Sequence, residues 1–153
     1  LFVGDGIIVP TNSEALMVDR VAARLKEAGG RVIEDEARRL APIAVGAAIV
    51  TGAGQLSVRA VIHVPVIELP GAKVGIENIR RATRAGLLAS THRQLERIAL
   101  PGIGVGEFGV PHDEAARAMI DEVRAYRGSH PQVVVLIEDD SEMLISFQTE
   151  LGL

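Results

Sequence analysis

Short runs that are apolar at nearly every position alternate along this chain with longer segments of helical periodicity. The first such run is Gly6–Pro10, and the last clear one is Gln132–Ile137. Uniformly apolar runs are typical of parallel strands, because helices cover both faces of a parallel sheet. The alternation therefore predicts an α/β fold with a mixed, mostly parallel central sheet and helices on both of its faces.

The same pattern predicts where the elements lie. Strands are expected over residues 6–10, 47–50, 60–64, 98–100 and 132–137, and helices over residues 14–28, 34–40, 77–93, 113–126 and 142–151. The polar segment Thr11–Ser13 precedes the first predicted helix and supplies suitable N-caps for it. Acidic residues 138–140 follow the last strand. Metal binding is one interpretation of this cluster, and a solvated helix start with Asp140 or Ser141 as the cap is the favoured one.

Length, charge and cysteine content exclude several classes of protein. The 153 residues are 48% hydrophobic, which suits a single domain with a buried core, and the net charge of −4 argues against non-specific nucleic-acid binding. The absence of cysteine excludes disulfides and fits a cytoplasmic location. No apolar run approaches the ~20 residues that span a bilayer. The four histidines lack the spacing of metal ligands, so we expect no metal and no cofactor.

A glycine-rich stretch, Leu100–Pro111, stands between a predicted strand and the predicted helix 113–126. Glycine tolerates positive φ, so successive N–H groups of such a loop can turn toward one anion. A loop of this kind ahead of a helix suits a phosphate group, although glycine-rich turns more often only join two elements. Gly104–Gly109 also matches G-x-G-x-x-G. A dinucleotide-binding fold is rejected, because Pro111 delays the helix and the next acidic strand end is too distant.

Four segments match the motifs of one family. Gly6–Asn12 is similar to an opening strand written A-I-V-N-A-A-N, and Val45–Leu56 is similar to G-x-A-x-x-T-x-x-x-x-L. Val61–His63 matches V-I-H, and Ile98–Pro111 aligns without gaps with I-A-F-P-A-I-S-T-G-I-Y-G-F-P. In this order the segments resemble the macro domain family, which binds ADP-ribose and includes Appr-1-p-processing members. The resemblance implies one three-layer α/β/α domain over residues 1–153, with the family's N-terminal strand missing or shortened.

The resemblance also implies a set of ligand-binding residues. The matching family loop wraps the diphosphate and the distal ribose with backbone N–H groups, and its residues correspond here to Gly104, Val105, Gly106, Glu107 and Phe108. Asn12 corresponds to an asparagine that hydrogen-bonds the distal ribose, and Phe108 to an aromatic residue beside that sugar. Judged from the residues alone, Asn12 is explained equally well as a helix N-cap.

The chain departs from the family pattern directly after Asn12. Where the family has a run of glycines ahead of a valine, this chain has Met17, Val18, Asp19 and Arg20 ahead of Val21. Asp19 would repel a diphosphate, whereas Arg20 can contact it through charge-assisted hydrogen bonds. Hydrolytic members often carry an aspartate after that valine, and here the position is Ala22. The chain therefore lacks part of the set of catalytic residues that hydrolytic members carry.

The adenine side of the implied site is also poorly matched. The family's adenine-binding aspartate lies in a Gly-Asp-Ile segment before the first strand motif. Asp5 is either that aspartate after a shortened connection or only the residue that opens the strand, and we favour the second interpretation. The family's aromatic residue near adenine corresponds to the aliphatic Ile137.

Three hypotheses about function remain. The first is a binding module for ADP-ribose or a related nucleotide diphosphate, a small-molecule partner. The second is a hydrolase of ADP-ribosyl or O-acetyl-ADP-ribose linkages, or an Appr-1-p phosphatase-like enzyme. The third is a macro-like domain without a ligand that acts in protein assembly. The sequence carries no strong nucleic-acid or membrane signal and does not indicate the oligomeric state.

Overall fold

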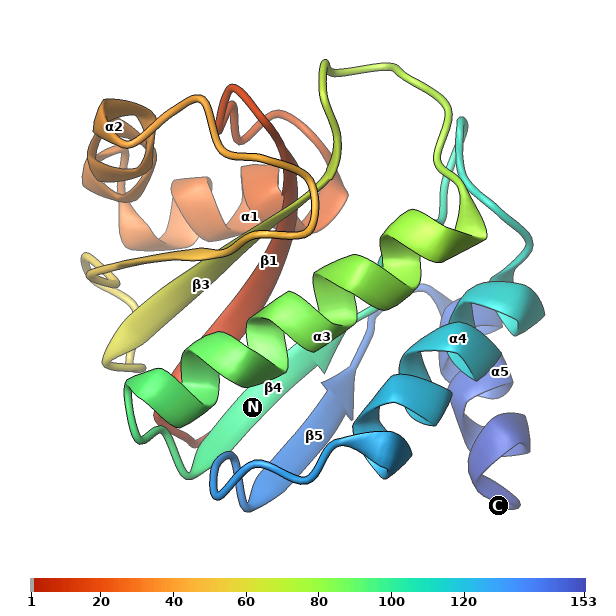
Figure 1. Cartoon of the computed structure of the whole chain (residues 1–153). Coiled ribbons are helices and arrows are strands. Elements are labelled where there is room, and N and C mark those ends of the chain that lie inside the picture. Colours follow the sequence, from red (N-terminus) through yellow and green to blue (C-terminus); the bar gives the residue numbers. More distant parts are fainter. Residues whose placement is uncertain (1) are drawn as a thin grey trace.

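A computed structural model describes residues 2–153, and its strands form one five-stranded sheet between two layers of helices (Figure 1). The strands are β1 (Gly6–Asn12), β2 (Ile49–Thr51), β3 (Ala60–Ile67), β4 (Arg97–Pro101) and β5 (Val133–Ile137). Their order across the sheet is β2-β3-β1-β4-β5. In the described part of the chain, β2 runs antiparallel to β3, whereas β1 with β3, β1 with β4, and β4 with β5 pair in parallel. The mixed, mostly parallel sheet and the α/β/α layering are confirmed.

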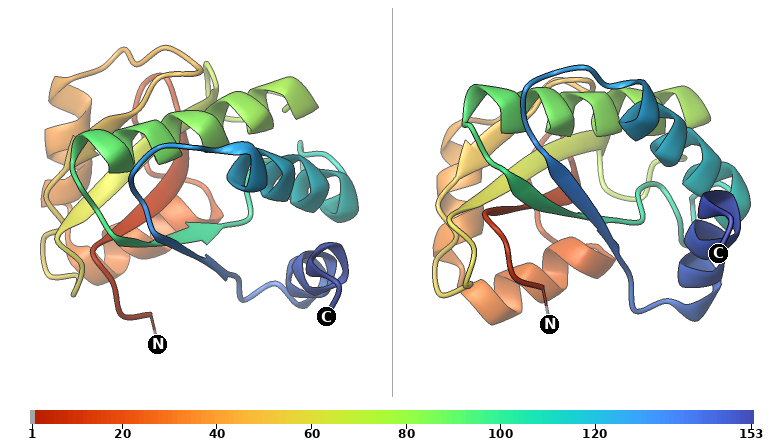
Figure 2. Two further views of the ribbon diagram at one scale, coloured as in Figure 1. Left: turned by 60° about the horizontal axis from the view of Figure 1, so that its bottom comes forward. Right: turned by 90° about the horizontal axis from the view of Figure 1, so that it is seen from below.

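The helices divide between the two faces of the sheet (Figure 2). On one side lie α3 (Ile76–His92), α4 (His112–Ala125) and α5 (Ser141–Leu151), and on the other lie α1 (Arg20–Gly29) and α2 (Val32–Arg39). Alternate residues of β1 serve the two layers, because side chains of a strand point to opposite faces. Ile8 packs in the α3–α5 layer, whereas Ile7 and Val9 pack in the α1–α2 layer. No helix in the described part of the chain is long and apolar enough to span a membrane.

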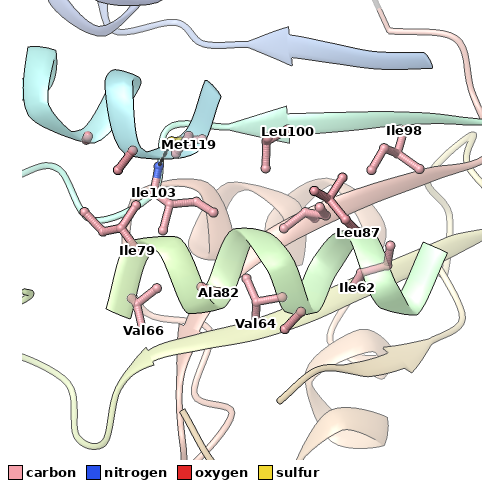
Figure 3. Packing of buried hydrophobic residues seen from close by; sticks show 14 of the residues in the cluster. Ile62, Val64, Val66, Ile79, Ala82, Leu87, Ile98, Leu100, Ile103 and Met119 are labelled. Atoms are coloured by element: carbon pink, nitrogen blue, oxygen red, sulfur yellow. Dashed lines mark hydrogen bonds between the residues drawn. The ribbon is translucent and has the colours of Figure 1, made fainter. Parts of the chain in front are cut away.

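Aliphatic side chains fill the larger core between the sheet and α3 (Figure 3). Only 3% of the residues are aromatic, so close packing depends on small residues that bring α3 near the strands. A Cβ atom at Gly86 of α3 would lie 2.5 Å from the Cδ1 atom of Ile8. At the end of β4, the backbone N–H of the fully buried Ile103 donates to the sulfur of Met119 at 3.3 Å. This contact anchors the start of the glycine loop to α4.

The first helix differs from its prediction. It was expected over residues 14–28 with a cap in Thr11–Ser13, but α1 begins at Arg20 and its N-cap is Asp19. The side chain of Asn12 bonds to the backbone of the following residues and competes with helical hydrogen bonds there. Ala15 has a φ of 58°, which a helix cannot accommodate. Residues 13–18 therefore form a loop despite their helical periodicity.

Candidate functional site

A pocket of about 300 Å³ lies at the carboxyl ends of β1, β3 and β4. Ligands of open α/β sheets bind at this edge. The walls of the pocket come from the end of β1, the start of α1, the end of β3 with the loop that follows, and the glycine loop. The lining residues are Pro10, Thr11, Asp19, Arg20, Val21, Val66, Ile67, Gly71, Ala72, Val74, Gly102 and Gly104–Gly109. The loops after β3 and β4 rise at the same end of the sheet (Figure 1).

The glycine loop, residues 102–109 after β4, presents a row of free backbone donors. Among residues 2–153, no acceptor takes a hydrogen bond from the N–H groups of Gly104–Phe108. The loop is closed instead by carbonyl groups, since Val110 N donates to Gly104 O at 2.8 Å and Gly109 N donates to Gly106 O at 3.1 Å. Gly104 and Gly106 have φ values of +77° and +117°. Alternating backbone conformations of this kind turn successive N–H groups toward one point and suit an anion.

The loop glycines are needed for two different reasons. A Cβ atom at Gly104 would lie 2.5 Å from the Cδ1 atom of Ile79, and one at Gly109 would collide with the carbonyl oxygen of Gly104. Gly106 has space around it, with the Cδ atom of Arg20 as the nearest contact at 3.5 Å. Its positive φ alone makes glycine the suitable residue there.

The start of α1 forms the facing wall of the pocket. Asp19, Arg20 and Val21 line it, and the first N–H groups of a helix have no partner within the helix. These donors and the helix dipole favour an anion at this point. Asp19 is exposed and its carboxylate makes no capping hydrogen bond, so its negative charge stands at the same wall. Met17 is buried in the α1–α2 layer and does not line the pocket.

Glu138 is a residue of this region that the sequence interpretation missed. It was expected in a solvated helix start, but its side chain is only 1% exposed. One carboxylate oxygen accepts from Arg20 Nη2 at 2.6 Å, and the other accepts from the backbone N–H of Gly102 at 3.1 Å. The expected cap is confirmed in Asp140, whose Oδ1 atom accepts from the N–H of Glu142. No local signal distinguishes the buried carboxylate from the exposed ones beside it.

Asn12 has a different surrounding from the one that its family role implies. Its side chain is fully buried and is not among the residues that line the pocket. Its Oδ1 atom accepts from the N–H groups of Glu14 and Leu16, and its Nδ2 atom donates to the carbonyl oxygen of Leu16 at 2.9 Å. A ribose contact from Asn12 therefore stays a prediction. In this structure its amide holds the loop ahead of α1.

Asp5 lies at the end of β1 opposite the pocket. Its Oδ2 atom accepts from the backbone N–H groups of Glu96 and Arg97, at 2.8 Å and 3.0 Å. These bonds, that of Arg97 foremost, lower the pKa of the Asp5 carboxyl. Asp5 directly precedes β1, and the absence of an adenine contact from this residue stays a prediction.

The remaining predicted residues line the pocket. Phe108 lines the pocket and is 52% exposed, and its carbonyl oxygen accepts from Val74 N at 3.0 Å. Val105, Glu107 and Val21 also line the pocket. Among residues 2–153, no group of three or more histidine or acidic side chains is placed to hold a metal ion.

Comparison with protein families and known sequences gives consistent matches. The model of the Macro domain family matches residues 8–119. An uncharacterized protein of Aquifex aeolicus is 42% identical over 149 residues, which cover 97% of this chain and 90% of that protein. An uncharacterized protein of Aeropyrum pernix is 36% identical over 138 residues, which cover 90% of this chain and 73% of that protein.

Solved structures share the fold at low sequence identity. A mutant of the Oceanobacillus iheyensis macrodomain, solved with ADPR, has a TM-score of 0.87 at 19% identity and covers 99% of this chain and 86% of its own. The Trypanosoma brucei macrodomain in complex with ADP-ribose has a TM-score of 0.87 at 18% identity and covers 97% of this chain and 64% of its own. At such identities the likeness shows the arrangement of the elements.

Proposed function

This chain belongs to the macro domain family, and we propose that it binds ADP-ribose or a related nucleotide diphosphate in the pocket at the carboxyl ends of its strands. The observation that carries the proposal is the row of unpaired N–H groups over Gly104–Phe108. A diphosphate accepts hydrogen bonds at many oxygens and is negatively charged at neutral pH. It therefore suits a row of backbone donors better than a neutral ligand does.

The other parts of the pocket suit the remaining groups of such a ligand. The start of α1, with Arg20 and Val21, adds donors and positive charge beside the phosphates. The exposed ring of Phe108 offers an apolar surface for a ribose. The solved relatives that hold ADPR and ADP-ribose share the arrangement of the elements that build this pocket.

The two alternative functions have less support. Hydrolysis needs a group that positions water or takes its proton, and the position after Val21 is Ala22, which is 1% exposed. A ligand-free domain would be favoured if the segment that replaces the family's glycines filled the pocket. Of that segment, Asp19 and Arg20 line the pocket, whereas Met17 is buried elsewhere.

Calorimetric titration with ADP-ribose, ADP and AMP tests the proposal. We expect binding of one ADP-ribose per chain, comparable binding of ADP, and weaker binding of AMP, because AMP has one phosphate fewer for the loop. Free ribose serves as the control ligand and is expected to give no heat. A folded protein that binds none of the three nucleotides would contradict the proposal.

A further inference from the structure

The side chain of Arg20 crosses the mouth of the glycine loop. It starts at the first residue of α1, and its Cδ atom lies 3.5 Å from the position that a Cβ atom of Gly106 would take. Its guanidinium then reaches the end of β5, where Nη2 lies 2.6 Å from Glu138 Oε1. Arg20 thus spans from one wall of the pocket to the strand on the far side of the loop.

Glu138 is a rigid anchor for this arginine. Besides Arg20, its two oxygens accept from the backbone N–H groups of Gly102, Asp139 and Asp140. With the side chain only 1% exposed, the carboxylate has no alternative partner in water. A buried carboxylate held by several donors keeps one position, and it fixes the guanidinium that it contacts.

The Arg20 guanidinium retains donors that no protein acceptor uses among residues 2–153. Only Nη2 has a protein acceptor among residues 2–153, which leaves Nε and Nη1 without one. The side chain is 32% exposed and lines the pocket. We infer that Glu138 is a positioning residue that holds Arg20 as a fixed clamp on the ligand's diphosphate. This inference rests on the proposed function.

The clamp explains how this chain can bind a diphosphate although it lacks the family's run of glycines. Where backbone N–H groups would approach the diphosphate, the chain places an arginine whose planar fork matches two phosphate oxygens.

Arg20→Ala tests the clamp, with Arg24→Ala as the matched control. Arg24 lies one turn further along α1, pairs with Asp139 and is not among the lining residues, so its variant removes the same charge without touching the pocket. We expect Arg20→Ala to weaken ADP-ribose binding on the order of tenfold or more, and Arg24→Ala to change it by less than about twofold. Equal effects of the two variants would overturn the inference.

A double-mutant cycle separates positioning by Glu138 from other roles. Glu138→Gln removes a negative charge near the anion, so simple electrostatics would strengthen binding, whereas a positioning role predicts weaker binding. We expect this weakening to disappear when Arg20 is already alanine. A role of Glu138 exerted only through Gly102 would weaken binding equally in both backgrounds and would overturn the inference.

Arg20→Lys, which keeps the charge without the planar fork, is expected to bind with intermediate affinity and provides a second test if Glu138→Gln does not fold.

Titration with inorganic pyrophosphate distinguishes failure of the inference from failure of the proposed function. A parent protein that binds pyrophosphate, loses this binding in Arg20→Ala and binds none of the three nucleotides would support the clamp and contradict the proposed function. Equal affinity of the parent and of Arg20→Ala for ADP-ribose would support the proposed function and overturn the inference about the clamp. A parent that binds neither probe would overturn both.

Discussion

At the scale of single residues, glycine is required at different positions of the glycine loop for different physical reasons. Gly104 and Gly109 are surrounded by atoms that leave no room for a Cβ, so a substitution there disturbs the packing of the loop. Gly106 has room, and only its φ of +117° excludes other residues. A change at Gly106 therefore alters the pocket and its backbone donors while leaving the core in place.

Gly106→Val is expected to abolish ADP-ribose binding in a protein that still folds. Valine is strained at this φ, at a cost on the order of 1–3 kcal/mol, and relief of the strain turns the loop N–H groups away. Gly152→Val is the matched control, because Gly152 has a φ of +80° with nothing within 4 Å and caps α5 away from the pocket. Calorimetry and thermal unfolding measure the two effects. Binding by Gly106→Val at parental affinity would mean that the cradle lies elsewhere.

Poor hydrolysis of ADP-ribosyl linkages is expected for the parent protein. Asn12, the candidate for holding a water, has its amide bonded to the loop backbone, and Ala22 has no proton-accepting group. Asp19 is the carboxylate at this wall of the pocket that remains free of a capping bond. The assay is release of ADP-ribose from a modified protein, with Asp19→Ala and Asn12→Ala as comparisons. Turnover by the parent that either variant loses would establish an enzyme.

At the scale of elements, the loop between β1 and α1 decides where the pocket wall stands. Helical periodicity alone would continue α1 back to Glu14, but the buried amide of Asn12 holds residues 13–16 in a turn. Met17 N, just after it, donates to the buried carboxylate of Glu34 at 2.7 Å. Together these bonds end the loop so that α1 begins with its N-terminus at the pocket.

Asn12→Ala is expected to lower the free energy of unfolding by about 3 kcal/mol, because three hydrogen bonds of a buried amide are lost and their backbone partners are left unpaired. Ser13→Ala is the control at the neighbouring position and is expected to stay within about 0.5 kcal/mol of the parent. Urea unfolding followed by circular dichroism measures both. A cost for Asn12→Ala as small as that of the control would show that this side chain does not hold the loop.

At the scale of the whole molecule, stability is coupled to pH through one buried histidine. His63 of β3 is fully buried, and its Nε2 atom pairs with Thr51 Oγ1 at 2.9 Å. Within residues 2–153 its Nδ1 atom has no hydrogen-bond partner. Burial lowers the pKa of His63 to about 4 from its ordinary value of 6.5. The unfolded chain takes up this proton first as the pH falls, so the folded state loses stability between pH 6.5 and pH 4.

The expected loss is about 1.4 kcal/mol for each pH unit below 6.5, up to about 3 kcal/mol in total. Urea unfolding at pH 7 and at pH 5 measures it in the parent and in His63→Gln. The variant is expected to have a lower stability at pH 7 but a smaller change between the two pH values. Asp5 and Asp140 also have lowered pKa values, but those carboxyls act at lower pH, near their ordinary value of 3.8. An equal pH dependence in the two proteins would exclude His63 as its source.

The sequence by itself determined the layers of this fold and the place of its pocket. Strands such as β1 and β3 are mostly apolar because both of their faces are buried, and that composition is readable without a structure. The glycine spacing of Gly104–Gly109 likewise predicts positive φ, because few other residues adopt it. These features depend on local composition, and so a local pattern is enough to find them.

Only the tertiary structure decided which polar groups face the pocket. Glu138 and its exposed neighbour Asp139 look alike in sequence, and the partner that buries Glu138, Arg20, lies 118 residues away in the chain. Asn12 matches a ligand-binding position, yet its amide is bonded to the loop that follows it. The energy of a polar side chain depends on donors and acceptors that packing brings to it, and no periodicity in the sequence records which ones these are.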